Sequence, residues 1–195
     1  MRAWRFIGLA LAALLSTGCA TSYLLEAQVR SFSRPPTPTA PFTYRHERLP
    51  SQAADAERAE LEALADAALA RAGLRRDDAA PRYSVQLQAR SQRVLSPYAD
   101  PRDPWFGLAW GWPARGWSWS LHRPFPRTEP DWYDRQVHLV LRDLASGQVV
   151  YETQAASDGP FFGQKPVFAA LLEAALKDFP APPEGARRVE VPIPR

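Results

Sequence analysis

The chain has 195 residues, of which 20 are proline, and its 24 basic and 21 acidic side chains give a formal net charge of +3. This length is enough for one domain with a hydrophobic core. A charge so close to balance argues against a nucleic-acid-binding protein, which needs a clustered basic face, and the single cysteine excludes a disulfide within the chain.

The N-terminus has the pattern of a bacterial lipoprotein signal over residues 1–18. Basic residues precede an apolar run, 6–15, which is shorter than the roughly 20 residues of a membrane span. The run leads through Thr-Gly to Cys19, and this sequence resembles a lipobox in which Ser16 replaces the usual leucine. The resemblance implies cleavage before Cys19 and attachment of diacylglycerol and a further acyl chain such as palmitate. Ala20 in the next position implies the outer membrane, on its periplasmic face.

The first part of the mature chain predicts two strands. Apolar residues alternate with polar ones over residues 21–32, which is the pattern of a half-buried strand. The proline-rich segment 35–41 cannot continue a ladder and predicts a loop. Residues 42–46 predict a second, shorter strand.

A helix follows, with Ser51 or Asp55 as its N-cap and Gly73 just beyond its last turn. Its charged side chains are predicted to face solvent, and they include Arg58 and Glu62 as an i,i+4 ion pair. The predicted apolar stripe of this helix consists of Leu61, Leu64, Ala65, Ala68 and Ala72, with Leu69 beside it.

The second half of the chain predicts three more alternating strands, a helix and an edge strand, separated by turns rich in glycine and proline. These segments are a strand at 83–89 running towards Val94, an insert at about 97–130, a hairpin of 137–142 and 149–155, a helix from Pro166 to Phe179, and an edge strand at 187–193. Strands interrupted by two helices predict a single α+β domain over residues 19–195. We expect a two-layer sandwich, with a mostly antiparallel sheet and two helices on one of its faces.

The insert is unusual because it gathers five tryptophans among glycines and prolines. Exposed rings of this kind stack on sugars, enter a membrane interface or anchor a protein partner. Alternatively, the rings fold back as a small core that covers the end of the sheet. The candidate contact surface consists of Trp105, Trp110, Trp112, Trp117 and Trp119.

Taken together, these features resemble a Gram-negative lipoprotein family that is catalogued only as a domain of unknown function. The features that carry the resemblance, in chain order, are the lipobox, Phe42-Thr43-Tyr44-Arg45, the Trp/Gly/Pro-rich insert, the hairpin 137–155, the helix end 178–180 and the closing segment 187–190. The resemblance implies an α+β domain associated with the outer membrane and supplies no catalytic residues.

The titratable residues do not form a recognisable catalytic or metal-binding motif. His46, His122 and His138 lie on or beside predicted strands, and no Gly-x-Ser-x-Gly elbow accompanies them. A metal site of His46, His138 and Asp134 requires the strand at 42–46 and the strand that contains His138 to be neighbours. Asp131 and Asp134 flank two aromatic residues, which would suit a carboxylate pair acting on a sugar, although solvated strand residues are the more usual reading.

We therefore expect a non-catalytic, lipid-anchored envelope lipoprotein without a metal or other cofactor. Its partners would be the membrane, through Cys19, and an envelope protein or a glycan. The alternative is a periplasmic hydrolase or glycan-processing enzyme that uses Asp131, Asp134 or His138. A third hypothesis, an accessory subunit of an outer-membrane machine, depends on analogy of fold.

Overall fold

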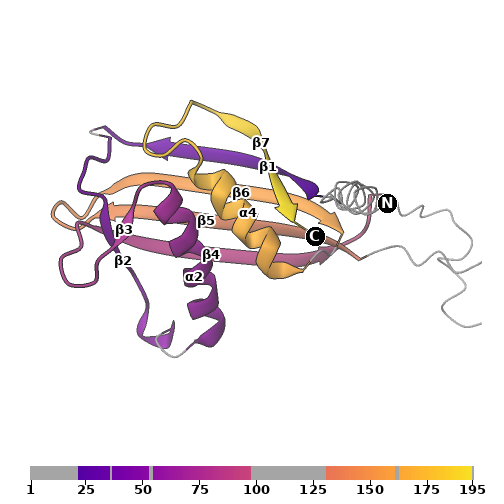
Figure 1. The fold of residues 1–195 in the computed structure, drawn as a ribbon, viewed down its shortest axis with the longest axis horizontal. Coiled ribbons are helices and arrows are strands. Elements are labelled where there is room, and N and C mark those ends of the chain that lie inside the picture. The colour runs from indigo at the N-terminus through magenta and orange to yellow at the C-terminus, as the bar shows by residue number, and fades with distance from the viewer. Residues whose placement is uncertain (1–21, 36, 53–54, 98–130, 161–162, 195) are drawn as a thin grey trace, which may run out of the picture.

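The computed structural model describes residues 22–35, 37–52, 55–97, 131–160 and 163–194. These residues form one sheet with two α-helices packed against it (Figure 1). The elements in chain order are β1 (Ser22–Ser33), β2 (Thr43–His46), the short 3-10 helix η1 (Pro50–Gln52), α2 (Ala56–Arg71), β3 (Arg75–Arg76), β4 (Tyr83–Val94), β5 (Trp132–Asp143), β6 (Val149–Pro160), α4 (Gln164–Leu176) and β7 (Ala186–Pro194).

The sheet has seven strands in the order β3-β2-β4-β5-β6-β1-β7. The neighbouring strands β4 and β5, β5 and β6, β6 and β1, and β1 and β7 pair antiparallel. Strand β2 runs parallel to both of its neighbours, β3 and β4. The prediction of a two-layer sandwich with a mostly antiparallel sheet is therefore wrong, because the sheet is mixed. The cause is the connection: the chain leaves β2, crosses over through α2 and returns beside β2, and such a helical crossover joins parallel strands.

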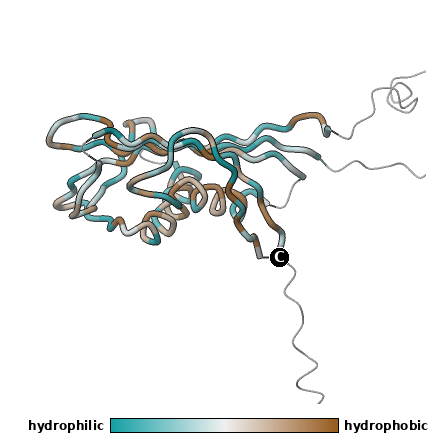
Figure 2. Tube along the Cα trace, turned by 90° about the horizontal axis from the view of Figure 1, so that it is seen from above, coloured by the Kyte–Doolittle hydropathy of each residue, from teal (hydrophilic) through white to brown (hydrophobic). Residues whose placement is uncertain are grey.

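The strands alternate as their sequences predict. In β1, Leu25, Ala27 and Val29 are buried, and the residues between them are exposed. The same face of the sheet carries the buried side chains of β4, β5 and β6, and α2 and α4 lie against it (Figure 2). The opposite face is polar, and on it Gln88 and Gln154 are exposed. The core thus lies between one face of the sheet and the two helices.

Helix α2 begins where Asp55 caps it, because the Asp55 carboxylate accepts hydrogen bonds from the backbone N–H groups of Glu57 and Arg58 at 3.0 and 3.2 Å. It ends before Gly73, whose φ of 89° suits a residue without Cβ. The predicted apolar stripe is only partly correct. Ala65, Ala68 and Leu69 are buried, but so are Arg58 and Glu62, while Leu61 and Leu64 are half-buried.

Helix α4 packs against β5, β6, β1 and β7, with Val167, Leu171, Leu172 and Ala175 fully buried. After its last turn, Phe179 packs edge-on against other aromatic rings. Its ring centroid lies 5.1 Å from that of Tyr151 and 5.3 Å from that of Phe42. The β5–β6 hairpin turns at 143–147, as predicted, and Gly147 has a φ of 71°.

Candidate functional site

One concave surface of the described residues follows one edge of β4. Strand β2 pairs with β4 only from Tyr83 to Val85, whereas β5 pairs with β4 over its whole length, to Val94. Among the described residues, no strand pairs with Leu87–Val94 on the side that faces away from β5. We call this side of Leu87–Val94 the free edge of β4.

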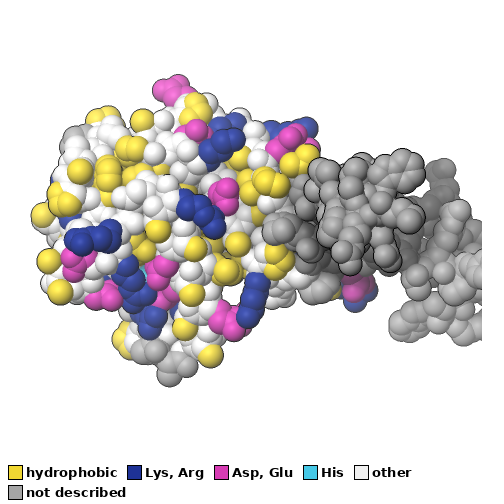
Figure 3. All heavy atoms as spheres, in the orientation of Figure 1, with side chains coloured by type: hydrophobic (Ala, Val, Ile, Leu, Met, Phe, Trp, Pro, Cys, Tyr) yellow, Lys and Arg dark blue, Asp and Glu magenta, His cyan; other side chains and the backbone are white. Residues whose placement is uncertain are grey.

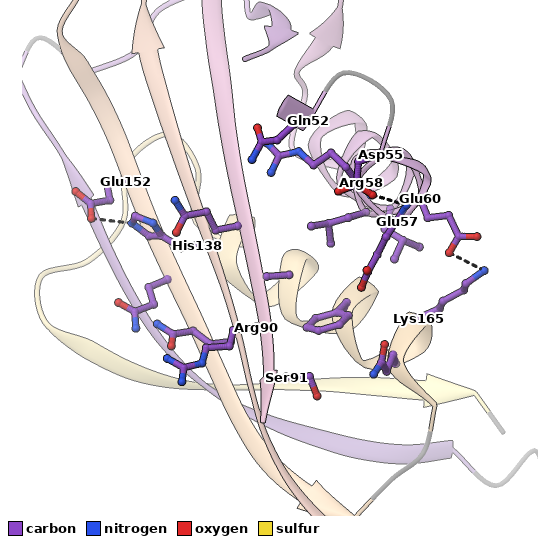
Figure 4. Close-up of a pocket in the computed structure, with 18 residues that line it drawn as sticks. Gln52, Asp55, Glu57, Arg58, Glu60, Arg90, Ser91, His138, Glu152 and Lys165 are labelled. Atoms are coloured by element: carbon purple, nitrogen blue, oxygen red, sulfur yellow. Dashed lines mark hydrogen bonds and ion pairs between the residues drawn. The ribbon is translucent and has the colours of Figure 1, made fainter. Parts of the chain in front are cut away.

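A groove of about 1310 Å³ runs along the free edge, between β4 and the two helices (Figure 4). Four consecutive residues of β4, Gln88 to Ser91, line it, and consecutive residues alternate between the two faces of a strand. The groove therefore borders the edge itself and reaches both faces of the sheet. Its helix side is partly apolar, with Leu61 and Leu64 from α2 and Phe168 from α4.

A buried ion-pair cluster that includes Arg58, one of the residues lining the groove, lies between α2 and β4. Glu62 is 1% exposed and accepts hydrogen bonds from Arg48 Nε at 2.9 Å and from Arg58 Nε at 3.2 Å. Arg58 Nη1 in turn donates to the backbone carbonyl of Leu87 at 2.7 Å. Burial raises the pKa of Glu62, but the hydrogen bonds from the two guanidinium groups outweigh it and lower that pKa. The cluster therefore ties α2 to the point where the free edge of β4 begins.

A second polar cluster lies between β2 and α2, centred on the Asp66 carboxylate. Tyr44 donates its hydroxyl proton to Asp66 Oδ1 at 2.7 Å, His46 Nε2 lies 2.6 Å from the same oxygen, and Arg76 donates to Oδ2 at 3.1 Å. Burial opposes ionisation, yet these hydrogen bonds lower the pKa of Asp66 to about 2. Burial and the neighbouring carboxylate raise the pKa of Tyr44. With the His46 side chain 2% exposed, this cluster is a packing contact rather than an accessible site.

The residues of the hydrolase hypothesis lie apart along and beside β5. Asp131 forms an ion pair with Arg93, and Asp134 is exposed. His138 Nε2 lies 2.9 Å from Glu152 Oε1, on the polar face of the sheet, and both side chains line the groove. Asp134 and His138 are four residues apart on one strand, which separates them by roughly 13 Å at 3.3 Å per residue. The structure does not bring the three side chains together.

A metal site of His46, His138 and Asp134 would require β2 and β5 to be adjacent strands, and they are not. Strand β4 lies between β2 and β5, so His46 and His138 come from strands that are not adjacent. His46 contacts α2 on the helix side, whereas His138 lies on the polar face. Over the described ranges, no group of three His, Cys, Asp or Glu side chains is placed to hold a metal ion.

Two predicted features lie outside the described residues. Cys19 falls within residues 1–21, and the five clustered tryptophans, Trp105, Trp110, Trp112, Trp117 and Trp119, fall within 98–130. Within the part of the chain that the structure describes, no helix has the length and apolar character of a membrane span. The described surface of the helix side carries basic and acidic side chains interspersed with one another (Figure 3).

Sequence reasoning missed the two polar clusters, although it paired Arg58 with Glu62. It placed the charged residues of α2 in solvent, where such residues usually lie. A signal was present in the spacing: Arg58, Glu62 and Asp66 repeat every four residues, which places them on one face of the helix. That row lies directly beside the buried Ala65 and Leu69, so it faces the edge strands.

Comparison with known proteins places the chain in a family. The sequence model of a family described as a domain of unknown function, DUF4136, matches residues 26–181. A comparison with curated proteins finds no match.

Solved structures give similarity at low identity. A PDZ domain protein from Parabacteroides distasonis is 13% identical with a TM-score of 0.49, and the alignment covers 92% of this chain and 41% of that one, so this chain spans less than half of that protein. Two PelC dodecamer structures from Paraburkholderia phytofirmans are 17% and 14% identical, with TM-scores of 0.45 and 0.44. These alignments cover 77% and 80% of this chain, and 94% and 99% of the PelC chains. Because the family model spans most of the sequence, the chain belongs to the DUF4136 family, and the resemblance to a family of unknown function is confirmed.

Proposed function

We propose that the protein is a non-catalytic, lipid-anchored envelope lipoprotein, whose domain is a periplasmic interaction module held at the outer membrane through Cys19. The observation that carries this proposal is the lipobox-like sequence that ends at the single cysteine, directly before the domain. Strand β1 begins at Ser22, three residues after Cys19. Three extended residues span at most about 11 Å, so acyl chains on Cys19 would hold the start of β1 close to the membrane.

The insert joins the domain at the same end of the sheet. Val94, at the end of β4, pairs with Trp132, at the start of β5, and Trp132 pairs with Pro160 at the end of β6. Figure 1 places these strand ends beside the start of β1. The tryptophan-rich segment thus leaves and re-enters the domain at the end that the lipid would hold, which supports a contact at the membrane surface, where tryptophan is favoured.

The hydrolase alternative gains no support from the geometry. Asp134 and His138 lie apart on β5, and Asp131, directly before β5, is already paired with Arg93. General acid–base chemistry needs the participating groups within reach of one substrate atom. We therefore retain the binding module as the proposed function.

Metabolic labelling with palmitate tests the anchor. We expect label in the wild-type protein and none in Cys19→Ala, because the thiol is the attachment point. Ser16→Leu is the matched control, since it restores the usual lipobox residue and should keep or increase the label. Equal labelling of wild type and Cys19→Ala would refute the anchor.

Substitution of the clustered tryptophans tests the contact surface. We expect replacement of Trp110, Trp112, Trp117 and Trp119 by alanine to change the set of proteins recovered with the chain from envelope extracts, with little change in melting temperature. The fourfold change to phenylalanine, which keeps most of the aromatic area, is the control. An unchanged partner set with a lower melting temperature would instead support a small core formed by these rings.

A further inference from the structure

The free edge of β4 presents a short row of backbone donors and acceptors. In a strand, the N–H and C=O of one residue point to the same side, and alternate residues point to the same neighbour. The carbonyl of Val85 accepts from the backbone N–H of Glu47 on this side, at 2.9 Å, and the carbonyl of Leu87 accepts from Arg58. By the same alternation, the peptide groups of Ala89 and Ser91 point away from β5.

These peptide groups have no backbone partner among the described residues. Strand β5 holds β4 in register over this whole stretch, from Leu87 opposite Leu139 to Val94 opposite Trp132, so the edge is held in extended form. An extended edge with unpaired N–H and C=O groups is a template for one more strand. Arg58 closes the template at Leu87, which limits it to a short run.

The groove provides room and an apolar floor for that strand. Side chains of an added strand would point alternately to the two faces of the sheet. Those that point to the helix side would meet Leu61, Leu64 and Phe168, which are half-buried and line the groove. Those that point to the polar face would meet Gln88 and Arg90.

Charges differ between the two walls of the groove. On the helix side, Asp55 and Glu57 are exposed carboxylates at the N-terminus of α2, and Glu60 beside them is paired with Lys165 at 3.0 Å. On the polar face, Arg90 is an exposed guanidinium next to the edge (Figure 4). Glu152 on the same face lies two strands further from the edge, on β6, and is paired with His138 at 2.9 Å. A complementary strand would therefore carry apolar and basic side chains on its helix side and acidic ones on its other side.

We propose that the free edge of β4 binds an extended segment of a partner protein as an added β-strand, with apolar and basic residues alternating with acidic ones. This proposal rests on the proposed function as an interaction module and names the chemistry of the partner. A second copy of this chain would be disfavoured in the register that sets Arg90 opposite Arg90, because like charges opposite one another destabilise paired strands.

The test uses the natively expressed protein, solubilised in detergent, and a fluorescein-labelled seven-residue peptide. The peptide has valine and lysine alternating at its odd positions and glutamate at its even positions. We expect saturable binding by fluorescence anisotropy below 1 mM, and at least tenfold weaker binding of a peptide with lysine and glutamate exchanged. Two further peptides are N-methylated, one at its odd-numbered amides and the other at its even-numbered amides. Because only alternate amides face β4, we expect one of them to bind at least tenfold more weakly and the other to bind nearly as well as the unmethylated peptide. Absence of binding at 1 mM, or an equal loss of binding in the two methylated peptides, would overturn the proposal.

Protein variants locate the site. Ala89→Pro removes one edge N–H that the β4–β5 ladder does not use, and proline is tolerated at such edge positions, so we expect binding to fall at least tenfold. Ser91→Ala keeps its N–H and should bind within twofold of wild type. Arg90→Glu should shift the preference towards the charge-exchanged peptide, a readout that a loss of folding would not give.

The oligomeric state distinguishes a partner protein from a second copy of this chain as the occupant of the free edge of β4. Sedimentation equilibrium of the natively expressed protein in detergent should show the same mass for wild type and Ala89→Pro. A dimer in the wild type that Ala89→Pro abolishes would identify a second copy as the occupant and overturn the assignment to a partner. Palmitate labelling of Cys19 is independent of these results, so failure of the peptide site and failure of the lipid anchor are distinguishable.

Discussion

His46 and Asp66 are joined across the interface of β2 and α2, with 2.6 Å between Nε2 and Oδ1. Tyr44, two residues earlier on β2, donates to the same oxygen, and its ring packs edge-on against the imidazole with centroids 5.6 Å apart. Arg76 of β3 donates to the other carboxylate oxygen. One carboxylate thus connects α2 to the two strands at the parallel edge of the sheet.

Because of this connection, we expect the free energy of unfolding to fall at acidic pH. The pKa of Asp66 in the folded protein is about 2, below the usual 3.8. A carboxyl whose pKa is lowered in the folded state contributes its full stabilisation at any pH above its unfolded-state pKa. That stabilisation is lost as the pH falls from 3.8 to about 2. The shift corresponds to about 2 kcal/mol, and urea unfolding between pH 2 and pH 7 measures it.

Asp66→Asn is the matched variant for that measurement. It keeps the shape of the side chain and removes the ionisation, so we expect lower stability at pH 7 and a flatter curve between pH 4 and pH 2. Asp134→Asn, on an exposed residue of β5, is the control and should leave the curve close to wild type. Parallel acid curves for wild type and Asp66→Asn would show that Asp66 does not carry the effect.

A second prediction concerns Arg58, which holds both the Glu62 carboxylate and the carbonyl of Leu87. Arg58→Met keeps the packing of the stem but leaves the carbonyl without its donor and Glu62 with Arg48 alone. We expect the free energy of unfolding to fall by about 1–3 kcal/mol, measured by urea denaturation. Glu57→Gln, one residue earlier and exposed, is the control. An Arg58→Met variant as stable as that control would show that the cluster is not structural.

Much of the fold was predictable because strands leave a strong alternating pattern. The β5–β6 hairpin and the alternation of β1 follow directly from their residues. The parallel placement of β2 was missed, because its four residues carry no pattern that distinguishes parallel from antiparallel pairing. The helix between β2 and β4 was the available signal, since a helical crossover brings the next strand back in the same direction.

The groove was harder to predict, because it arises where an element is short rather than from a motif. Strand β2 ends at His46 while β4 continues to Val94, and only the three-dimensional pairing shows the difference. The buried positions of Arg58 and Glu62 were missed for a similar reason. A charged row on a helix faces solvent in most proteins, and here it faces a strand whose carbonyl needs a donor.

A third prediction concerns the hydroxyl chain under α4. Thr153 Oγ1 donates to the carbonyl of Ala175 at 2.9 Å, so the 2.8 Å contact between Ser31 and Thr153 must use the Ser31 proton. Thr153→Val keeps the shape of this fully buried side chain and removes both of its hydrogen bonds. We expect the free energy of unfolding to fall by about 1–3 kcal/mol.

Urea denaturation measures this change, and Ser31→Ala in the Thr153→Val background separates its parts. Because Ser31 has already lost its acceptor in Thr153→Val, the second substitution should cost less than Ser31→Ala alone in the wild type. Equal costs in both backgrounds would show that the two hydroxyls are not coupled.

The last prediction concerns Arg135, whose side chain is 2% exposed on the helix side of β5. Its Nε and Nη2 have no acceptor among the residues that the structure describes, its guanidinium carbon lies 5.0 Å from the centre of the Tyr133 ring, and burial lowers its pKa. A desolvated charge without a counter-ion is costly, and its contact with the ring returns only about 0.5–2 kcal/mol. We therefore expect Arg135→Met to raise the free energy of unfolding by about 1 kcal/mol in urea denaturation. Arg93→Met, on an exposed residue, should change it little. A marked loss of stability in Arg135→Met would mean that the guanidinium meets a counter-charge in the native protein.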